Sequence, residues 1–224
     1  MKQGAKAAVV LSGCGFLDGA EITEAVSVLV HLSRLGASVD CFAPAIELDE
    51  VDHAAHKPTG AKRSVLKESA RIARGRIAPL TELNPSRYDA IFFPGGFGAA
   101  KNLCDFAARG PACPVNPDVV RVLKAFHAAG KPIGLCCIAP VLAAKVLGKA
   151  AGGPGVSVTL GNDPNVASAV AAMGSTHVEK PVTAACTDPV NKVATAPAYM
   201  YDARPHEVFQ GIGEMVESTL KLCT

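Results

Sequence analysis

Tryptophan is absent from this sequence of 224 residues, and aromatic residues make up only 5% of it. The core must therefore be built from aliphatic side chains, which suits tight packing of helices on a sheet. The sequence has no long block of basic residues and no aromatic residues between basic ones, so nucleic-acid binding is not expected. No apolar run approaches the roughly 20 residues of a membrane-spanning helix, so no membrane association is expected either.

None of the eight cysteines forms the C-x-x-C pair that is typical of zinc sites, so no metal site is expected. Cys136 and Cys137 are adjacent, which is awkward for two ordinary disulfides. No secretory signal precedes the first apolar segment, so we interpret the cysteines as free thiols in a reducing compartment. Since no amphipathic leader rich in Arg and Ser is present, a cytoplasmic location is expected, with a mitochondrial location after processing as the alternative.

Short apolar segments alternate with segments of helical periodicity, which is typical of a doubly wound α/β fold with a mostly parallel sheet. We expect a single domain over residues 1–224, since no linker or repeat divides the chain. The polar segment 49–63 is expected to be an excursion with a small hairpin. The expected strands are 7–11, 39–44, 88–93, 132–136 and 156–160, with antiparallel edge strands at 182–187 and 192–195. The expected helices lie within 19–35, 64–73, 117–129, 141–147, 165–173 and 205–222.

The segment 134–140 reads GLCCIAP, so a buried strand ends in cysteine and a helix begins within a few residues. We expect Cys136 to point into the sheet layer and Cys137 to lie on the turn. The backbone N–H groups and the dipole of the next helix are expected to lower the pKa of Cys137 and to face a developing oxyanion. The alternative is a pair of ordinary core cysteines.

Two further features follow other predicted strands. The segment 94–98, PGGFG, places Gly95 and Gly96 where the backbone can approach a ligand closely, unless it is a plain tight turn. Glu24 lies near the start of the first predicted helix and could act as a general base beside a thiol. Its alternative is a capping or solvated carboxylate, although Glu21 fits the role of first-turn dipole partner better.

Several motifs together resemble the ElbB-type glyoxalase-like proteins, in the PfpI and parkinsonism-associated deglycase branch of the class I glutamine amidotransferase-like superfamily. The resemblance covers nearly the whole chain. It is carried by GCG at 13–15 with DGAEI at 18–22, PGGFGAAKNL at 94–103, GKPIG at 130–134 with CIAP at 137–140, and TAPAYM at 195–200.

The resemblance implies a flavodoxin-like three-layer sandwich, a homodimer, and a catalytic pair that maps to Glu24 and Cys137. It also implies an oxyanion hole from the backbone N–H groups of Gly96 and Ile138, beside Gly95. The implied activity is a glyoxalase that needs no glutathione, metal or organic cofactor and converts glyoxal or methylglyoxal to glycolate or lactate. The possible pocket residues are Cys14, Lys101 and Asn102, of which the last two could instead cap the following helix.

Departures from related patterns limit the function. PfpI-type peptidases place a histidine directly after the nucleophile, where this chain has Ile138. Amidotransferases need a downstream His-x-Glu, whereas His206 and Glu207 are adjacent, so peptidase or glutaminase activity is not expected unless His177 or His206 reaches the turn. The alternatives to the glyoxalase are a redox sensor that holds Cys137 as a sulfinate and a protein that binds a carbonyl metabolite, with a possible effect on isoprenoid metabolism.

Overall fold

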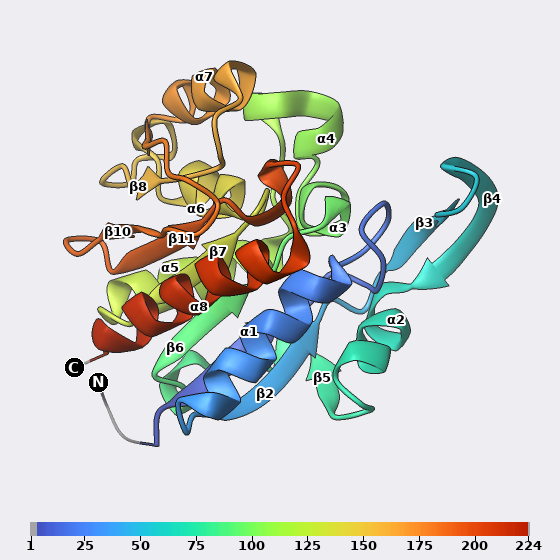
Figure 1. Ribbon diagram of the computed structural model, residues 1–224, viewed down its shortest axis with the longest axis horizontal. Coiled ribbons are helices and arrows are strands. Elements are labelled where there is room, and N and C mark those ends of the chain that lie inside the picture. Colours follow the sequence, from blue (N-terminus) through green and yellow to red (C-terminus); the bar gives the residue numbers. More distant parts are fainter. Residues whose placement is uncertain (1–3, 224) are drawn as a thin grey trace.

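The computed structural model describes residues 4–223, and a seven-stranded sheet forms its centre (Figure 1). The strand order is β10-β11-β7-β6-β1-β2-β5, and every neighbouring pair is parallel except β10 and β11. The predicted α/β fold is therefore confirmed. The strands are β1 Lys6–Val10, β2 Ser38–Ala43, β5 Ile77–Pro79, β6 Ala90–Phe93, β7 Ile133–Cys136, β10 Cys186–Asp188 and β11 Val193–Ala196.

Helices cover both faces of this sheet, because successive strand residues point to opposite sides. In β1, Ala7 and Val9 pack with the helices α1 (Ile22–Arg34) and α8 (Pro205–Lys221). Ala8 and Val10 belong to a second core with α5 (Pro117–Ala128) and α6 (Pro140–Val146). Figure 1 shows α1 and α8 together in front of the sheet and α5 and α6 behind it, which makes the predicted three layers.

The remaining elements are short or lie outside the central sheet. They are the hairpin β3 Glu47–Asp52 and β4 Lys57–Ser64, the two-stranded parallel sheet β8 Ser157–Val158 and β9 Thr176–His177, and the helices α2 Val65–Ile72, α3 Phe97–Lys101, α4 Phe106–Arg109 and α7 Pro164–Ala172. Short 3₁₀ turns join several of them. No helix in the described part of the chain is both long enough and apolar enough to cross a membrane.

Two strand predictions need correction. The antiparallel pair near the carboxyl end exists, but only β10 lies at the edge, since β11 also pairs in parallel with β7. The apolar segment 156–160 contributes only the two residues of β8, which pair with β9 outside the central sheet. An apolar run indicates burial, but it does not tell which sheet buries the strand.

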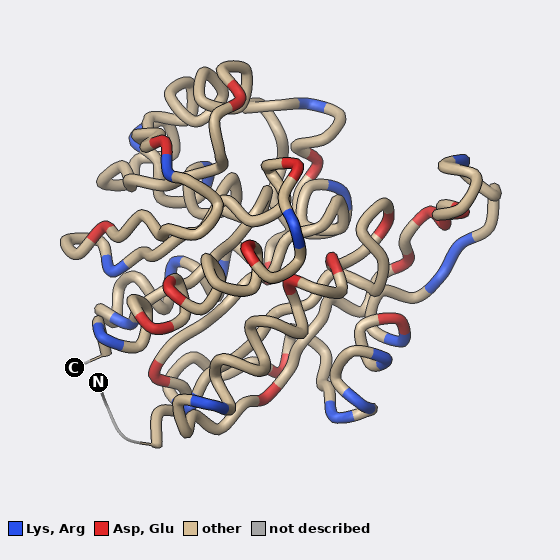
Figure 2. The backbone as a smooth tube through the Cα atoms, viewed as in Figure 1, with Lys and Arg blue, Asp and Glu red and all other residues tan. Residues whose placement is uncertain are grey.

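The hairpin β3–β4 projects from the body of the protein beside α2 (Figure 1). Acidic residues follow one strand and basic residues the other, as Figure 2 shows. Arg63, at the base of the hairpin, pairs with Asp18 at 2.5 Å, with Glu68 at 2.7 Å and with Glu50 at 3.1 Å. The predicted excursion is therefore an ordered arm, and its base is tied by ion pairs to the loop after β1.

Candidate active site at the carboxyl end of the sheet

Cys137 lies on the sharp turn between β7 and α6, as the sequence predicts. Its φ is 59°, in the left-handed region that a side chain with a Cβ rarely adopts. Backbone hydrogen bonds fix the turn, since Cys137 N donates to Ala196 O at the end of β11 at 2.9 Å and Ala139 N donates to Cys136 O at 3.0 Å. Cys136 is wholly buried in the core below α1 and α8, so Cys137 is the thiol that reaches the end of the strand.

Glu24 lies in the first turn of α1 and is wholly buried. Its Oε1 accepts a hydrogen bond of 3.2 Å from Tyr199 N, whereas its Oε2 has no hydrogen-bond partner of ordinary geometry among the described residues. The capping alternative is wrong for Glu24, because Glu21 caps the helix by accepting a 2.6 Å hydrogen bond from Glu24 N. A buried carboxyl with a free oxygen is costly in a core and calls for an explanation by function.

Gly95 shows how close the carboxyl and the thiol are. A Cβ at this position would meet Cys137 Cβ and would lie 2.6 Å from Glu24 Oε2. Gly96, with a φ of 90°, leaves equally little room, because a Cβ there would meet the backbone before α1. The two glycines therefore let the loop after β6 pass between α1 and the turn, and they bring Glu24 and Cys137 together.

Burial dominates the protonation of this pair. It raises the pKa of Glu24 to about 8, helped by the charge of Glu21 and opposed by hydrogen bonding from Tyr199 N, Cys137 and Gly95 N. Burial, followed by the charge of Glu24, also raises the pKa of Cys137 well above its ordinary value, although Gly96 N–H opposes this. The expected lowering of the thiol pKa is therefore wrong, because burial favours the neutral forms of both groups.

A pocket of about 440 Å³ opens over the turn. Cys137 and Gly96 line it, as does Ile138, so a molecule in the pocket can reach both the thiol and the neighbouring backbone. Glu24 is not among the lining residues and lies beside the thiol. The lining residues are Phe16, Glu21, Gly96, Phe97, Cys137, Ile138, Asp163, Val166, Tyr199 and Met200.

Three of the predicted pocket residues lie elsewhere. Asn102 Nδ2 donates to Ser12 O and to Asp18 O, both at 2.8 Å, and so fastens the loop after β1. Lys101 Nζ donates to Leu17 O at 2.9 Å in the same loop. Cys14 is half-buried among charged groups near the base of the hairpin. None of the three lines the pocket, because the loop after β1 binds Lys101 and Asn102 and because Cys14 lies near the hairpin.

Most of the pocket wall was not predicted from the sequence. Phe16 and Phe97 follow β1 and β6, and Asp163 caps α7 by accepting a 2.8 Å hydrogen bond from Asn165 N. The signal for Asp163 was present, since Asp-Pro before an apolar periodic segment is typical of a helix start. For the phenylalanines no signal existed in the chain itself, because only the fold brings the two loops together.

No histidine lines the pocket. His177 lies on β9, where its Nε2 is 3.3 Å from Leu160 N, and His206 is exposed at the start of α8. A Cys-His arrangement of the peptidase or amidotransferase kind is therefore not assembled in the described residues. No group of three side chains there could hold a metal ion either.

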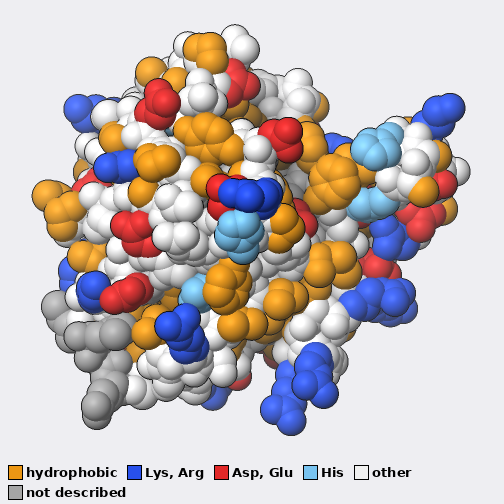
Figure 3. Space-filling view, viewed as in Figure 1, with side chains coloured by type: hydrophobic (Ala, Val, Ile, Leu, Met, Phe, Trp, Pro, Cys, Tyr) orange, Lys and Arg blue, Asp and Glu red, His pale blue; other side chains and the backbone are white. Residues whose placement is uncertain are grey.

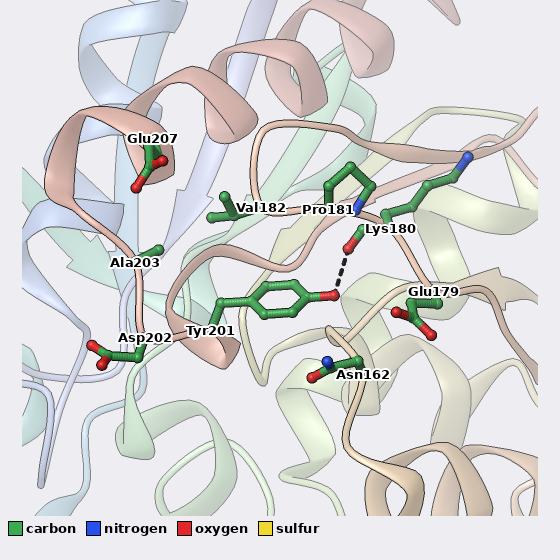
Figure 4. A pocket seen from close by; sticks show the side chains of 9 residues that line it. All are labelled: Asn162, Glu179, Lys180, Pro181, Val182, Tyr201, Asp202, Ala203 and Glu207. Atoms are coloured by element: carbon green, nitrogen blue, oxygen red, sulfur yellow. Dashed lines mark hydrogen bonds between the residues drawn. The ribbon is translucent and has the colours of Figure 1, made fainter.

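A second pocket, of about 600 Å³, lies beside the start of α8 (Figure 4). Tyr201 crosses it, and its hydroxyl donates a 2.8 Å hydrogen bond to Lys180 O. This pocket contains neither a thiol nor a strained residue, and its acidic side chains Glu179, Asp202 and Glu207 lie apart around it. The smaller pocket at Cys137 is therefore the one that contains a thiol and a strained residue.

Comparison with known proteins supports the resemblance found in the sequence. No protein-family model matches the chain. The human glutamine amidotransferase-like class 1 domain-containing protein 3, mitochondrial, is 52% identical over 229 residues, which cover 97% of this chain and 83% of that protein. The mitochondrial ES1 protein homolog of Rattus norvegicus is 51% identical over 229 residues, with 97% and 84% covered. This chain belongs to the ES1 family.

Solved structures extend this assignment from the ES1 family to its fold. An isoprenoid biosynthesis protein with an amidotransferase-like domain from Ehrlichia chaffeensis superposes with a TM-score of 0.92 at 34% identity, over 98% of this chain and 100% of that one. The predicted class I glutamine amidotransferase-like fold is confirmed. Glyoxalase III of Candida albicans superposes with a TM-score of 0.66 over 99% of this chain and 98% of that one, at 13% identity, and so shares the fold alone.

One expectation is overturned by the ES1 relatives. The cytoplasmic location predicted from the sequence is wrong, because the human and rat relatives, identical to this chain at about half of the aligned positions, are named as mitochondrial proteins. The prediction depended on the composition of the first few residues, which is a weaker guide than relatives that match nearly the whole chain.

Proposed function

We propose that the protein is a glutathione-independent glyoxalase-like enzyme that acts on small 2-oxoaldehydes, with Cys137 as nucleophile and Glu24 as acid and base. The observation that carries the proposal is the pair itself: a strained cysteine at the floor of a pocket, with a buried carboxyl that keeps one oxygen free beside it. Such a pair supplies the two groups that the reaction needs, a nucleophile and a proton carrier.

The first step forms a bond between Cys137 Sγ and the aldehyde carbon. The thiol proton passes through Glu24 to the carbonyl oxygen, which gives a hemithioacetal. The backbone N–H groups of Gly96 and Ile138 face the oxygen while it carries negative charge. Through Glu24, the proton on the former aldehyde carbon then moves to the neighbouring carbonyl carbon. The hydroxyl proton moves to the oxygen of that neighbouring carbon, which gives a 2-hydroxyacyl thioester. Water cleaves the thioester and releases lactate, so the sum is one added water and no external oxidant or reductant.

The test is lactate formation from methylglyoxal without glutathione. We expect wild type to turn over and Cys137→Ser to lose about 10³-fold or more of kcat, as removal of a nucleophile does elsewhere. Glu24→Gln should lose turnover as well, because an amide cannot carry the proton. Cys136→Ala is the matched control: it removes the adjacent, wholly buried thiol and should keep the activity. An inactive wild type, or an active Cys137→Ser, contradicts the proposal.

The redox-sensor alternative finds less support. A sensor cysteine needs a reactive thiolate and access for the oxidant, whereas burial raises the pKa of Cys137 and only 7% of the residue is exposed. A shared proton suits a thiol that becomes nucleophilic only when an aldehyde is bound. The protein that only binds a carbonyl metabolite would use the same pocket, and the lactate measurement separates it from the enzyme.

A further inference from the structure

Most of the pocket wall over Cys137 is apolar. Its large side chains come from loops and helices that lie far apart in the chain: Phe16, Phe97, Ile138, Val166 and Met200. A volume of about 440 Å³ is far more than glyoxal or methylglyoxal can fill, because molecules of four or five heavy atoms leave most of such a wall in contact with water.

The side chains of Phe16 and Phe97 are partly exposed to solvent, and a hydrogen bond joins the segments that carry them. Phe16 is 41% exposed and Phe97 is 46% exposed, although rings of this size are normally buried. Phe97, the first residue of α3, is joined to the loop after β1 by a hydrogen bond of 2.7 Å from its N to Phe16 O, so the two rings are held near each other. Large apolar side chains that stay exposed in a rigid position at a pocket favour an apolar ligand that covers them.

The charged groups that line the pocket are all acidic. Glu21 and Asp163 are both helix caps, and no lysine, arginine or histidine is among the lining residues. The amine of Lys101 lies 5.0 Å from the ring centre of Phe97, but it donates to Leu17 O and does not line the pocket. His53 meets the edge of Phe16 at 5.4 Å and also stays outside. An anionic ligand would meet two carboxylates and no counter-charge.

We propose that this pocket selects uncharged carbonyl compounds that carry an apolar group larger than methyl, such as an aryl group, and that it rejects carboxylate-bearing ones. Phe16 and Phe97 are the specificity-determining residues, and Glu21 and Asp163 exclude anions. The part of this proposal that concerns conversion of the carbonyl compound rests on the proposed function. The part that concerns which molecules the pocket admits to Cys137 does not depend on turnover.

The first measurement is kcat/KM for three 2-oxoaldehydes: methylglyoxal, phenylglyoxal and 4-carboxyphenylglyoxal, of which the last two differ by one carboxylate. We expect phenylglyoxal to exceed methylglyoxal by about tenfold or more, and the carboxylated compound to fall below phenylglyoxal by a similar factor. Phe97→Ser should remove the advantage of the aryl group, so that the ratio of kcat/KM for phenylglyoxal to kcat/KM for methylglyoxal falls toward one. Phe16→Ser gives the same test from the other loop, should one variant fold poorly.

The second measurement needs no turnover. Alkylation of Cys137 is followed by mass spectrometry with iodoacetamide, iodoacetate and N-phenyl iodoacetamide. Each rate is divided by the rate of the same residue in the chain unfolded in urea, which removes the intrinsic reactivity of the reagent. The N-phenyl reagent should have the highest ratio and iodoacetate the lowest. Asp163→Asn should raise the ratio for iodoacetate relative to the ratio for iodoacetamide.

The two measurements test the proposed function and the selectivity of the pocket independently. If no aldehyde is converted but the alkylation ratios follow the expected order, the proposed function falls and the selectivity of the pocket stands. If methylglyoxal is converted but the ratios are equal, or iodoacetate reacts fastest, the selectivity is overturned and the proposed function stands. If both phenylalanine variants keep the wild-type preference for phenylglyoxal over methylglyoxal, the proposed role of the two rings is overturned as well.

Discussion

Cys137 and Glu24 each adopt a state that costs free energy. A non-glycine residue in the left-handed region costs about 1–3 kcal/mol, and burying a carboxyl with an unpaired oxygen costs a similar amount or more. The two side chains that carry these costs lie next to each other, and such unfavourable local states are known to cluster at functional sites. The structure tolerates them because the Tyr199 and Ala196 backbones hold the two residues in place.

Glu24 should make the stability of the protein depend on pH in an unusual direction. Its pKa rises from an ordinary 4.5 to about 8 on folding, so the folded chain holds this proton more tightly than the unfolded chain. Stability from this group is therefore fully present below pH 4.5 and is lost as pH rises toward 8. We expect wild type to lose on the order of a few kcal/mol between these values.

The measurement is urea unfolding of wild type and Glu24→Gln at pH 5.5 and pH 8.5. Glutamine has the same shape and no titrating proton, so the variant should be the more stable of the two at pH 8.5, and the gap should close or reverse at pH 5.5. All other titrating groups are common to both proteins and cancel in the difference. A gap that does not change with pH would mean that Glu24 is ionised throughout.

The sequence predicted which two residues form this pair, but it did not predict their pKa values. The strand that ends in GLCCIAP predicted the position of Cys137, and the helical pattern predicted that Glu24 could face the strand ends. The predicted low pKa of the thiol failed, because a motif shows the nearby helix end but not the depth of burial. Lys101 and Asn102 failed for a similar reason: only the fold shows that the loop after β1 binds their side chains.

Among the elements, the hairpin β3–β4 depends most on a single residue. Two strands are marginally stable alone, so the arm needs its attachment to the body. Arg63 provides that attachment through Asp18 and Glu68, whose side chains are 1% and 8% exposed. Val51 N also donates a 2.9 Å hydrogen bond to Asp18. The same Asp18 belongs to the loop that carries Phe16, so the arm and the pocket wall share one support.

Arg63→Leu should therefore destabilise the protein by about 3–5 kcal/mol, because it leaves the buried carboxylate of Asp18 without its counter-charge. Lys62→Leu is the matched control on the same strand, since its ion pair with Asp49 is largely exposed and should contribute little to stability. Thermal or urea unfolding of the two variants measures the difference. Equal losses would show that the buried ion pair does not hold the arm.

Elements with a strong local pattern were predictable, and the others were not. The apolar runs of β1, β6 and β7 and the periodic segments of α1, α5 and α8 were all located within a few residues. The short strands β5 and β9 were missed, since two or three residues carry no period of their own. Such pieces become strands only because a neighbour pairs with them.

At the scale of the whole molecule, the predicted homodimer requires an interface on the surface of the protein. The front of the molecule in Figure 3 shows hydrophobic side chains between charged ones over α1 and α8. On α1, the exposed residues Ile22, Val26 and Val30 are 49%, 43% and 43% exposed and recur every four positions. This row lies along one side of the helix and could pack against the same row of a second copy, as a two-fold interface requires.

We predict that the protein forms a homodimer through this row and that Val26→Glu combined with Val30→Glu makes it a monomer. Charged side chains facing their own copies across a two-fold axis repel each other and lose the apolar contact. Light scattering should give twice 22.9 kDa for wild type and 22.9 kDa for the variant. Val190→Glu is the control, because Val190 is 89% exposed in the turn between β10 and β11, away from α1. A monomeric wild type, or a double variant that stays dimeric, would exclude this surface.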